Sequence, residues 1–145
     1  MPINVINPDG LPTVDLYHQV AVASGSRMVF LAGQVSVDAD GALVGAGDLA
    51  TQVEQCFRNV ATALAAAGAT FADVAKLTVY LVDWTPDKMA ALADGISRAS
   101  AALGISAPPP LTGNRCGRPR GSGTAGRGGG HRRRGVSRAT VLNTG

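Results

Sequence analysis

Few residues of this chain have the types and spacing that chemistry requires. The stretch GAGDLA, residues 45–50, matches a glycine-rich fingerprint for pyrophosphate, but it lacks the preceding strand and the later acidic residue of such a site. The histidines, His18 and His131, have no cysteine or carboxylate companions at ligand spacing, so we predict no metal site and no cofactor. We interpret residues 45–50 as a loop and helix cap, and His18 as a partly exposed strand residue.

Three further side chains are candidates for a reactive or pocket-lining role. Cys56 falls on the apolar face of a predicted helix, which predicts a buried and inert thiol. Cys116 stands in a different sequence context, so we expect no disulfide. Trp84 directly follows a predicted strand, where it either lines a pocket or covers the core. The residue types alone therefore predict no catalytic group.

The first half of the chain predicts two strands and a helix. Residues 19–24 and 28–35 are typical of strands joined by a turn, and we expect a hairpin whose second strand is buried and central. Asp48 is a suitable cap for a helix that Gly68 ends. Apolar residues recur at three- and four-residue steps in this helix, which predicts one buried face. The face comprises Val53, Cys56, Phe57, Val60, Leu64 and Ala67.

A strand over 73–83 and a second helix follow. Thr85 and Pro86 begin this helix, because proline is tolerated at the first helical position, and Gly104 ends it. Its predicted buried face comprises Leu92, Ile96, Ala99 and Leu103. The order of elements predicts an α+β fold with two helices on one face of a mixed sheet. Further strands or a partner subunit must then cover the other face.

The charges are divided sharply along the chain. Residues 1–113 hold all ten acidic residues and five basic ones, whereas residues 114–145 hold eight arginines. We predict one domain over 1–113 and a disordered Gly/Arg-rich tail over 114–145, which lacks the aromatic residues usual in RNA-binding arms. With neither a membrane-spanning apolar run nor a signal peptide, we expect a cytoplasmic protein without membrane or nucleic-acid partners.

The tail is also compatible with a one-base shift of the reading frame near Asn114. In a GC-rich gene, arginine and glycine codons read one base forward permit a Val-Glu-Val-Glu-like run that suits a closing strand. We therefore predict that residues 114–145 are out of frame and that the domain as written lacks its final strand.

Residues 17–84 contain short motifs in a fixed order: AGQ at 32–34, Gln52 in the first helix, AAAGAT at 65–70 and VAKLTVYLVD at 74–83. Together they resemble the Rid (YjgF-type) family of reactive intermediate deaminases. The resemblance implies a chorismate-mutase-like α+β fold. It also implies a homotrimer with ligand sites in the clefts between subunits, where partner subunits cover the bare sheet face.

The family resemblance also implies a chemistry. Rid enzymes hydrolyse 2-enamines and 2-imines, such as 2-iminobutanoate, to keto acids and ammonia, and an arginine holds the substrate carboxylate. Carried over to this sequence, Tyr17 would line the cleft and Gly33 would offer its backbone. Leu111, with Thr112 beside it, stands at the position of the arginine. The chain thus resembles an arginine-lacking branch, either a deaminase-type hydrolase or a non-catalytic ligand-binding paralogue, with an RNA-interacting protein as a further alternative.

Overall fold

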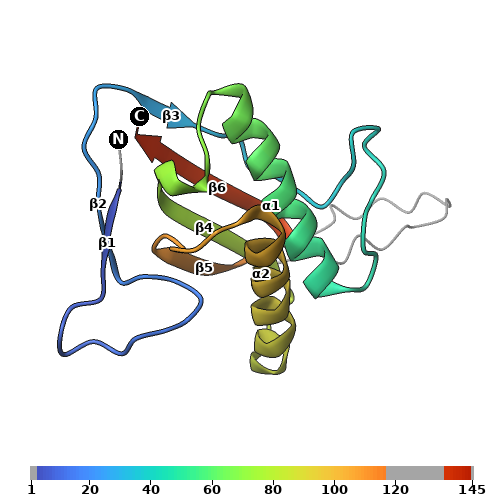
Figure 1. Ribbon diagram of the computed structural model, residues 1–145. Helices are drawn as coiled ribbons and strands as arrows, with labels where there is room; N and C mark the ends of the chain where they lie inside the picture. The colour runs from blue at the N-terminus through green and yellow to red at the C-terminus, as the bar shows by residue number, and fades with distance from the viewer. Residues whose placement is uncertain (1–2, 117–135, 145) are drawn as a thin grey trace, which may run out of the picture.

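The computed structural model describes residues 3–116 and 136–144. Four strands form a mixed sheet in the order β3-β6-β4-β5, and two more form a separate small sheet (Figure 1). In chain order the elements are β1 (Asn4–Ile6), β2 (Val20–Val22), β3 (Met28–Phe30), α1 (Leu49–Ala66), the 3-10 helix η1 (Phe71–Asp73), β4 (Val74–Val82), the 3-10 helix η2 (Pro86–Lys88), α2 (Met89–Leu103), β5 (Leu111–Cys116) and β6 (Val136–Thr144).

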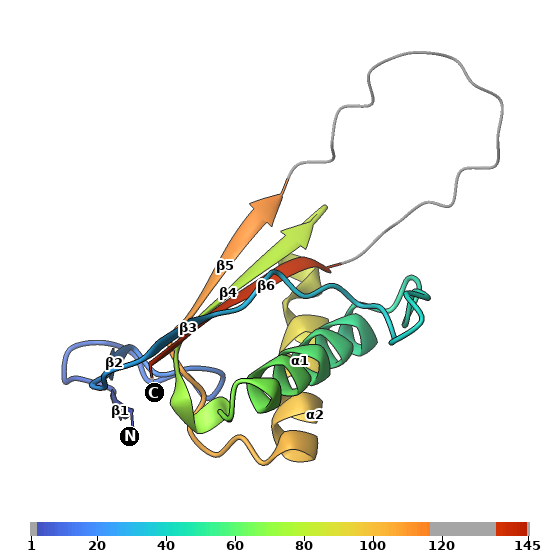
Figure 2. The same ribbon diagram turned by 90° about the horizontal axis from the view of Figure 1, so that it is seen from above.

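The two α-helices lie on one face of the four-stranded sheet, as Figure 2 shows. Strands β4 and β5 are parallel, whereas β6 runs antiparallel to both of its neighbours, β3 and β4. This arrangement confirms the predicted α+β fold with two helices on one face of a mixed sheet. Within the described part of the chain, no helix is both long enough and apolar enough to cross a membrane.

Helix α1 begins and ends where the sequence predicts. Its N-cap is Asp48, at the end of a loop over 45–48, and the helix stops at Ala66. Gly68 follows with a φ of 71°, in the left-handed region that glycine favours. The predicted apolar face is buried except at Ala67, the half-buried C-cap, and its buried members are Val53, Cys56, Phe57, Val60 and Leu64.

The core lies between the two helices and the helix-facing side of the sheet. Leu77, Val79 and Leu81 alternate along β4, as period-two geometry requires, and none is more than 4% exposed. The rings of Phe57 and Phe71 stack with their centroids 5.6 Å apart. Helix α2 adds Leu92, Ile96 and Ala99 to the core, with Leu103 partly buried beside them.

Cys56 is part of this core, as predicted. Burial raises the pKa of its thiol to about 12, because an apolar environment disfavours the charged thiolate. The thiol therefore stays neutral at physiological pH, which agrees with an inert structural role.

Gly95 allows α1 and α2 to approach closely. A Cβ atom at this position would lie 2.6 Å from the carbonyl oxygen of Ala50 and 2.7 Å from the Cβ of Val53. The first of these atoms belongs to the backbone of α1, so it moves only if the first turn of the helix moves. The absence of a side chain at residue 95 thus sets the separation of the two helices.

The predicted hairpin of residues 19–24 and 28–35 is wrong. Strand β2 pairs with β1, while β3 pairs with β6 near the other end of the chain. β3 lies at the edge of the sheet instead of its centre, and its residues Met28 and Phe30 are 59% and 67% exposed. A short apolar run indicates a strand, but it does not specify the partner strand or the depth of burial.

The sheet contains strands beyond residue 113, where the sequence predicts the end of the domain. Strand β5 continues to Cys116, and residues 136–144 form β6 between β3 and β4. The sequence VSRATVLNT is rich in β-branched residues and contains no glycine or proline, a composition that favours a strand. Residues 117–135, with His131 and most of the predicted tail, lie outside the described residues.

The reading-frame hypothesis concerns the gene, and it stays a prediction. The structural argument for it is that the sheet lacks a closing strand. This argument does not apply to the described residues, because β6 occupies the position between β3 and β4.

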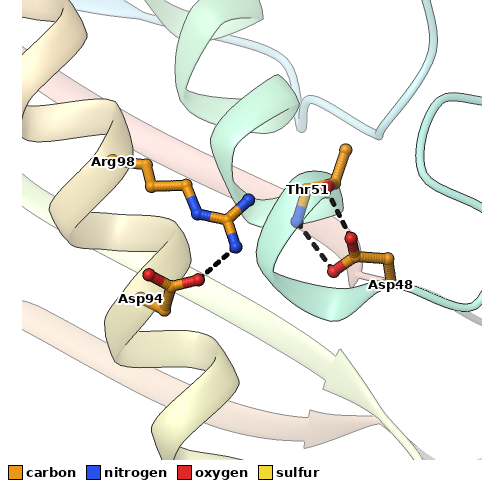
Figure 3. Close-up of polar contacts among 4 residues, drawn as sticks. All are labelled: Asp48, Thr51, Asp94 and Arg98. Carbon is orange, nitrogen blue, oxygen red and sulfur yellow. Dashed lines mark hydrogen bonds and ion pairs between the residues drawn. The ribbon is translucent and has the colours of Figure 1, made fainter.

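Two polar pairs lie near each other, one at the start of α1 and one on α2 (Figure 3). The carboxylate of Asp48 accepts hydrogen bonds from the Thr51 backbone N–H at 3.2 Å and from the Thr51 hydroxyl at 2.7 Å. Arg98 donates to Asp94 one turn earlier on α2. The hydrogen bonds from Thr51, and more weakly the charge of Arg98, hold the pKa of Asp48 below its ordinary value.

We predict that Gly95→Ala destabilises the protein, although alanine is intrinsically the better helix former by about 1 kcal/mol. The added methyl group must push α1 and α2 apart, at a cost of about 1–3 kcal/mol. Urea unfolding followed by circular dichroism measures this change. Ser97→Ala, at an exposed position of the same helix, is the matched control and should be neutral or slightly stabilising. A Gly95→Ala protein as stable as the wild type would contradict the close approach.

We predict that Asp48 contributes a pH-dependent part of the stability. Because its pKa is lower in the folded than in the unfolded protein, the carboxylate stabilises the fold above the ordinary value of 3.8. That contribution is lost as the pH falls through the lower, folded-state pKa.

Thermal melts of the wild type and Asp48→Asn, from about pH 7 down to about pH 3, test this prediction. Asparagine keeps the cap but has no charge to titrate, so the difference in melting temperature should shrink as the pH falls. A constant difference would show that the Asp48 charge adds nothing. Asp48→Ala, which removes the cap, should be less stable than both proteins at neutral pH.

Candidate ligand pocket

A cavity of about 300 Å³ lies between α2 and the β4–β5 edge of the sheet. Its volume is at the lower end of the usual range for small-ligand sites. The walls are largely apolar, and the polar groups are few. Helix α2 contributes Met89, Leu92 and Ile96, the two strands contribute Leu81, Leu111, Gly113, Asn114 and Arg115, and the neighbouring segments contribute Leu16, Tyr17 and Trp84.

Strand β5 lines the cavity from one of its faces. Because side chains alternate across a strand, Leu111, Gly113 and Arg115 belong to the same face. A Cβ atom at Gly113 would meet nothing within 4 Å, so this glycine leaves open space between its two neighbours on the face. The register places Leu81 of β4 opposite Arg115, which closes the cavity along the sheet.

The turn after β4 directs Trp84 to the cavity. Asp83 has a φ of 51°, in the left-handed region that aspartate tolerates better than most residues. The side chain of Lys88 donates a hydrogen bond to the carbonyl oxygen of Asp83, which ties the turn to the start of α2. Trp84 lines the cavity and also packs against the core, so both roles considered for it from the sequence apply.

His18 connects the Tyr17 segment to the chain that leads into β5. Its backbone N–H donates to the carbonyl oxygen of Pro108 at 3.2 Å, and its Nδ1 atom lies 2.7 Å from the same oxygen. Since a carbonyl oxygen only accepts, Nδ1 carries the hydrogen. His18 is half-buried, as predicted, but it lies in a loop instead of a strand. The two hydrogen bonds hold together segments that are 90 positions apart.

The structure brings together two of the four predicted ligand residues. Tyr17 and Leu111 both line the cavity. Thr112 belongs to the opposite face of β5, where its hydroxyl accepts a hydrogen bond from the Lys76 Nζ at 2.5 Å. Gly33 lies in the segment after β3, outside the lining of this cavity.

Sequence reasoning missed Met89, Asn114 and Arg115. Strand alternation alone places Arg115 on the face of Leu111, but this signal was hidden when residue 114 was assigned to a disordered tail. Met89 requires the position of α2 over β5, which no local pattern specifies. No group of three or more histidine, cysteine, aspartate or glutamate side chains that could hold a metal ion is present in the described residues.

The fold and the cavity define a class of protein. In this class two helices cover one face of a mixed sheet, and in this chain a cavity lies beside the crossover from β4 through α2 to β5. The sequence model of the family described as endoribonuclease L-PSP matches residues 9–110. The chain therefore belongs to this family, which is the Rid or YjgF-type family.

Individual relatives agree with this assignment. Protein DfrA of Myxococcus xanthus is 31% identical over 84 residues, which are 57% of this chain and 64% of the relative. A RutC family protein of Pyrococcus abyssi is 38% identical over 57 residues, which are 39% of this chain and 45% of the relative. The matched part of the chain thus spans less than two thirds of each curated relative. The crystal structure of YyfB, a Rid family protein from Yersinia pestis, superposes with a TM-score of 0.78 at 26% identity and covers 99% of both chains.

We predict that His18→Ala destabilises the protein by about 1 kcal/mol, the typical net contribution of one part-buried hydrogen bond. His18→Asn is the matched control, because the amide nitrogen of asparagine takes nearly the position of Nδ1 and can donate to Pro108. Urea unfolding of the three proteins measures the difference. His18→Asn should recover most of the lost stability, and equal losses in both variants would contradict the role assigned to this hydrogen bond.

Proposed function

We propose that this protein binds small imino or keto metabolites in the pocket between α2 and the β4–β5 edge. The observation that carries the proposal is that Tyr17 and Leu111 line a single cavity. These residues come from distant parts of the chain, and both stand at positions that the family resemblance assigns to the ligand. The apolar walls and few polar groups are typical of a small-molecule site.

The reaction that family membership suggests is hydrolysis of an enamine or imine. The oxygen of a water molecule bonds to the imine carbon, the carbon–nitrogen bond breaks, and nitrogen leaves as ammonia, so that a keto acid remains. In the pocket of this chain, Leu111 offers no hydrogen-bond donor to a substrate carboxylate. The described lining also contains no aspartate or glutamate. We therefore propose that this chain binds such metabolites and hydrolyses short imino acids slowly at most.

The proposal extends to a homotrimer in the cytoplasm. Met28 and Phe30 expose apolar surface on the edge strand β3, and exposed apolar surface of this kind suits contact with another subunit. In a trimer, Gly33 and Thr112 would reach a ligand from a neighbouring subunit, since both lie outside the cavity of their own chain.

We predict that Leu111→Arg increases hydrolysis of 2-iminobutanoate. A guanidinium at this position would form charge-assisted hydrogen bonds to the substrate carboxylate, which corresponds to about a tenfold or greater rise in kcat/KM. The imine is generated by oxidation of 2-aminobutanoate, and semicarbazide traps the fraction that escapes the enzyme.

Leu111→Gln is the control, because it adds polarity at the same position without charge. The wild type and Leu111→Gln should both be slow. Fast hydrolysis by the wild type would contradict the need for an anchor at residue 111. No gain in a folded Leu111→Arg protein would contradict the proposed pocket as the site of the reaction.

A further inference from the structure

We propose that Arg115 is the anion anchor of the pocket, and that the ligand is a monocarboxylate with a branched or aromatic apolar body. This inference rests on the proposed function, because it assumes that the cavity is the ligand site. It goes further by placing the carboxylate at the opposite end of the cavity from Leu111, the position at which the family pattern would place an arginine.

The cavity has one polar end and one apolar end. In a crossover between parallel strands, the helix runs antiparallel to both strands. The start of α2, at Met89, therefore lies near the ends of β4 and β5, where Trp84, Asn114 and Arg115 line the cavity. Ile96, further along α2, lies towards the start of β5.

The apolar end is formed by Leu111, at the start of β5, and Ile96. A ligand with charge at one end and hydrocarbon at the other matches this distribution. An uncharged polar metabolite would place polar atoms against the apolar walls.

Arg115 is available to an external anion. The ion pairs between described residues include those of Arg58 with Glu54 and of Arg98 with Asp94, and neither involves Arg115. The described lining of the cavity contains no carboxylate. A planar guanidinium can hold a carboxylate through two parallel hydrogen bonds.

The position of Arg115 sets the size of the ligand. Four residue steps along the strand separate its Cα from that of Leu111, a distance of about 13 Å. The long arginine side chain spans part of this distance, and Gly113 leaves the space between them open. A body the size of a leucine or phenylalanine side chain then reaches the apolar end, whereas the two-carbon chain of 2-iminobutanoate would not.

Fluorescence of Trp84 provides the test, because it is the single tryptophan of the chain and lines the cavity. The probes are 4-methyl-2-oxopentanoate, its uncharged methyl ester, and pyruvate, which has the same head group without the apolar body. An intact mass that does not match the sequence containing Arg115 would bear out the reading-frame prediction and overturn the role of Arg115. We expect the branched acid to bind at least about tenfold more tightly than either other probe, with an affinity that falls as salt is added.

Arg115→Gln should weaken binding of the branched acid by about tenfold and leave binding of the ester unchanged. Arg58→Gln is the matched control, since it removes the same charge from α1, outside the cavity lining, and should bind the acid like the wild type.

Equal binding of the acid and the ester, or unchanged binding of the acid by Arg115→Gln, would contradict the role of Arg115 as the anchor. Either result would still leave the pocket as a ligand site. Tighter binding of pyruvate than of the branched acid would overturn the ligand class. No response of folded wild-type protein to any probe would overturn both this inference and the proposed function.

Discussion

Leu77, Val79 and Leu81 form an apolar row along one face of β4, and this row packs into one buried cluster with Val53 and Phe57 of α1. Burial of each such side chain contributes about 1.5–3 kcal/mol, so this contact supplies much of the core. It also constrains the positions of α2 and β5. The chain leaves β4, crosses through α2 and returns as the parallel strand β5, so α2 must share the sheet face that α1 already occupies.

The pocket is a consequence of that shared face. Gly95 holds α2 against α1 by letting the two backbones approach, which keeps the other side of α2 over β5. On β5, Gly113 places no side chain in the space beneath the helix. His18 and Pro108 then close the end of the crossover, because their hydrogen bonds hold the Tyr17 segment against the entry to β5. Packing that stabilises the fold thus also leaves a cavity at the sheet edge.

Local patterns predicted the elements that bury one face of their own. Asp48 and Gly68 bound α1 because capping and left-handed glycine are local effects, and the alternation of β4 reflects its burial directly. Pairing was not predictable in the same way. β3 is only three residues long and pairs with β6 near the opposite end of the chain, so nothing near residue 28 specifies its partner.

The residues of the candidate site were also predictable only in part. Tyr17 and Leu111 were found through motifs shared with a family, and the structure places them in one cavity. Gly33 and Thr112 were placed with them by the same resemblance, but strand alternation puts Thr112 on the other face of β5. Arg115 was overlooked because overall composition assigned it to a tail, although its position on a strand is what gives it a role. The place of Met89 in the cavity lining depends on how α2 crosses β5, which is a property of the tertiary structure.

We propose that the cavity between α2 and β5 is where this protein binds its ligand. Methyl-labelled methionine tests it directly, because Met89 lines the cavity whereas Met28 is exposed on the distant edge strand β3. In a carbon–proton correlation spectrum, titration with 4-methyl-2-oxopentanoate should shift the Met89 methyl signal progressively to saturation and leave that of Met28 in place. A bound ligand that shifts Met28 and not Met89 would contradict the account.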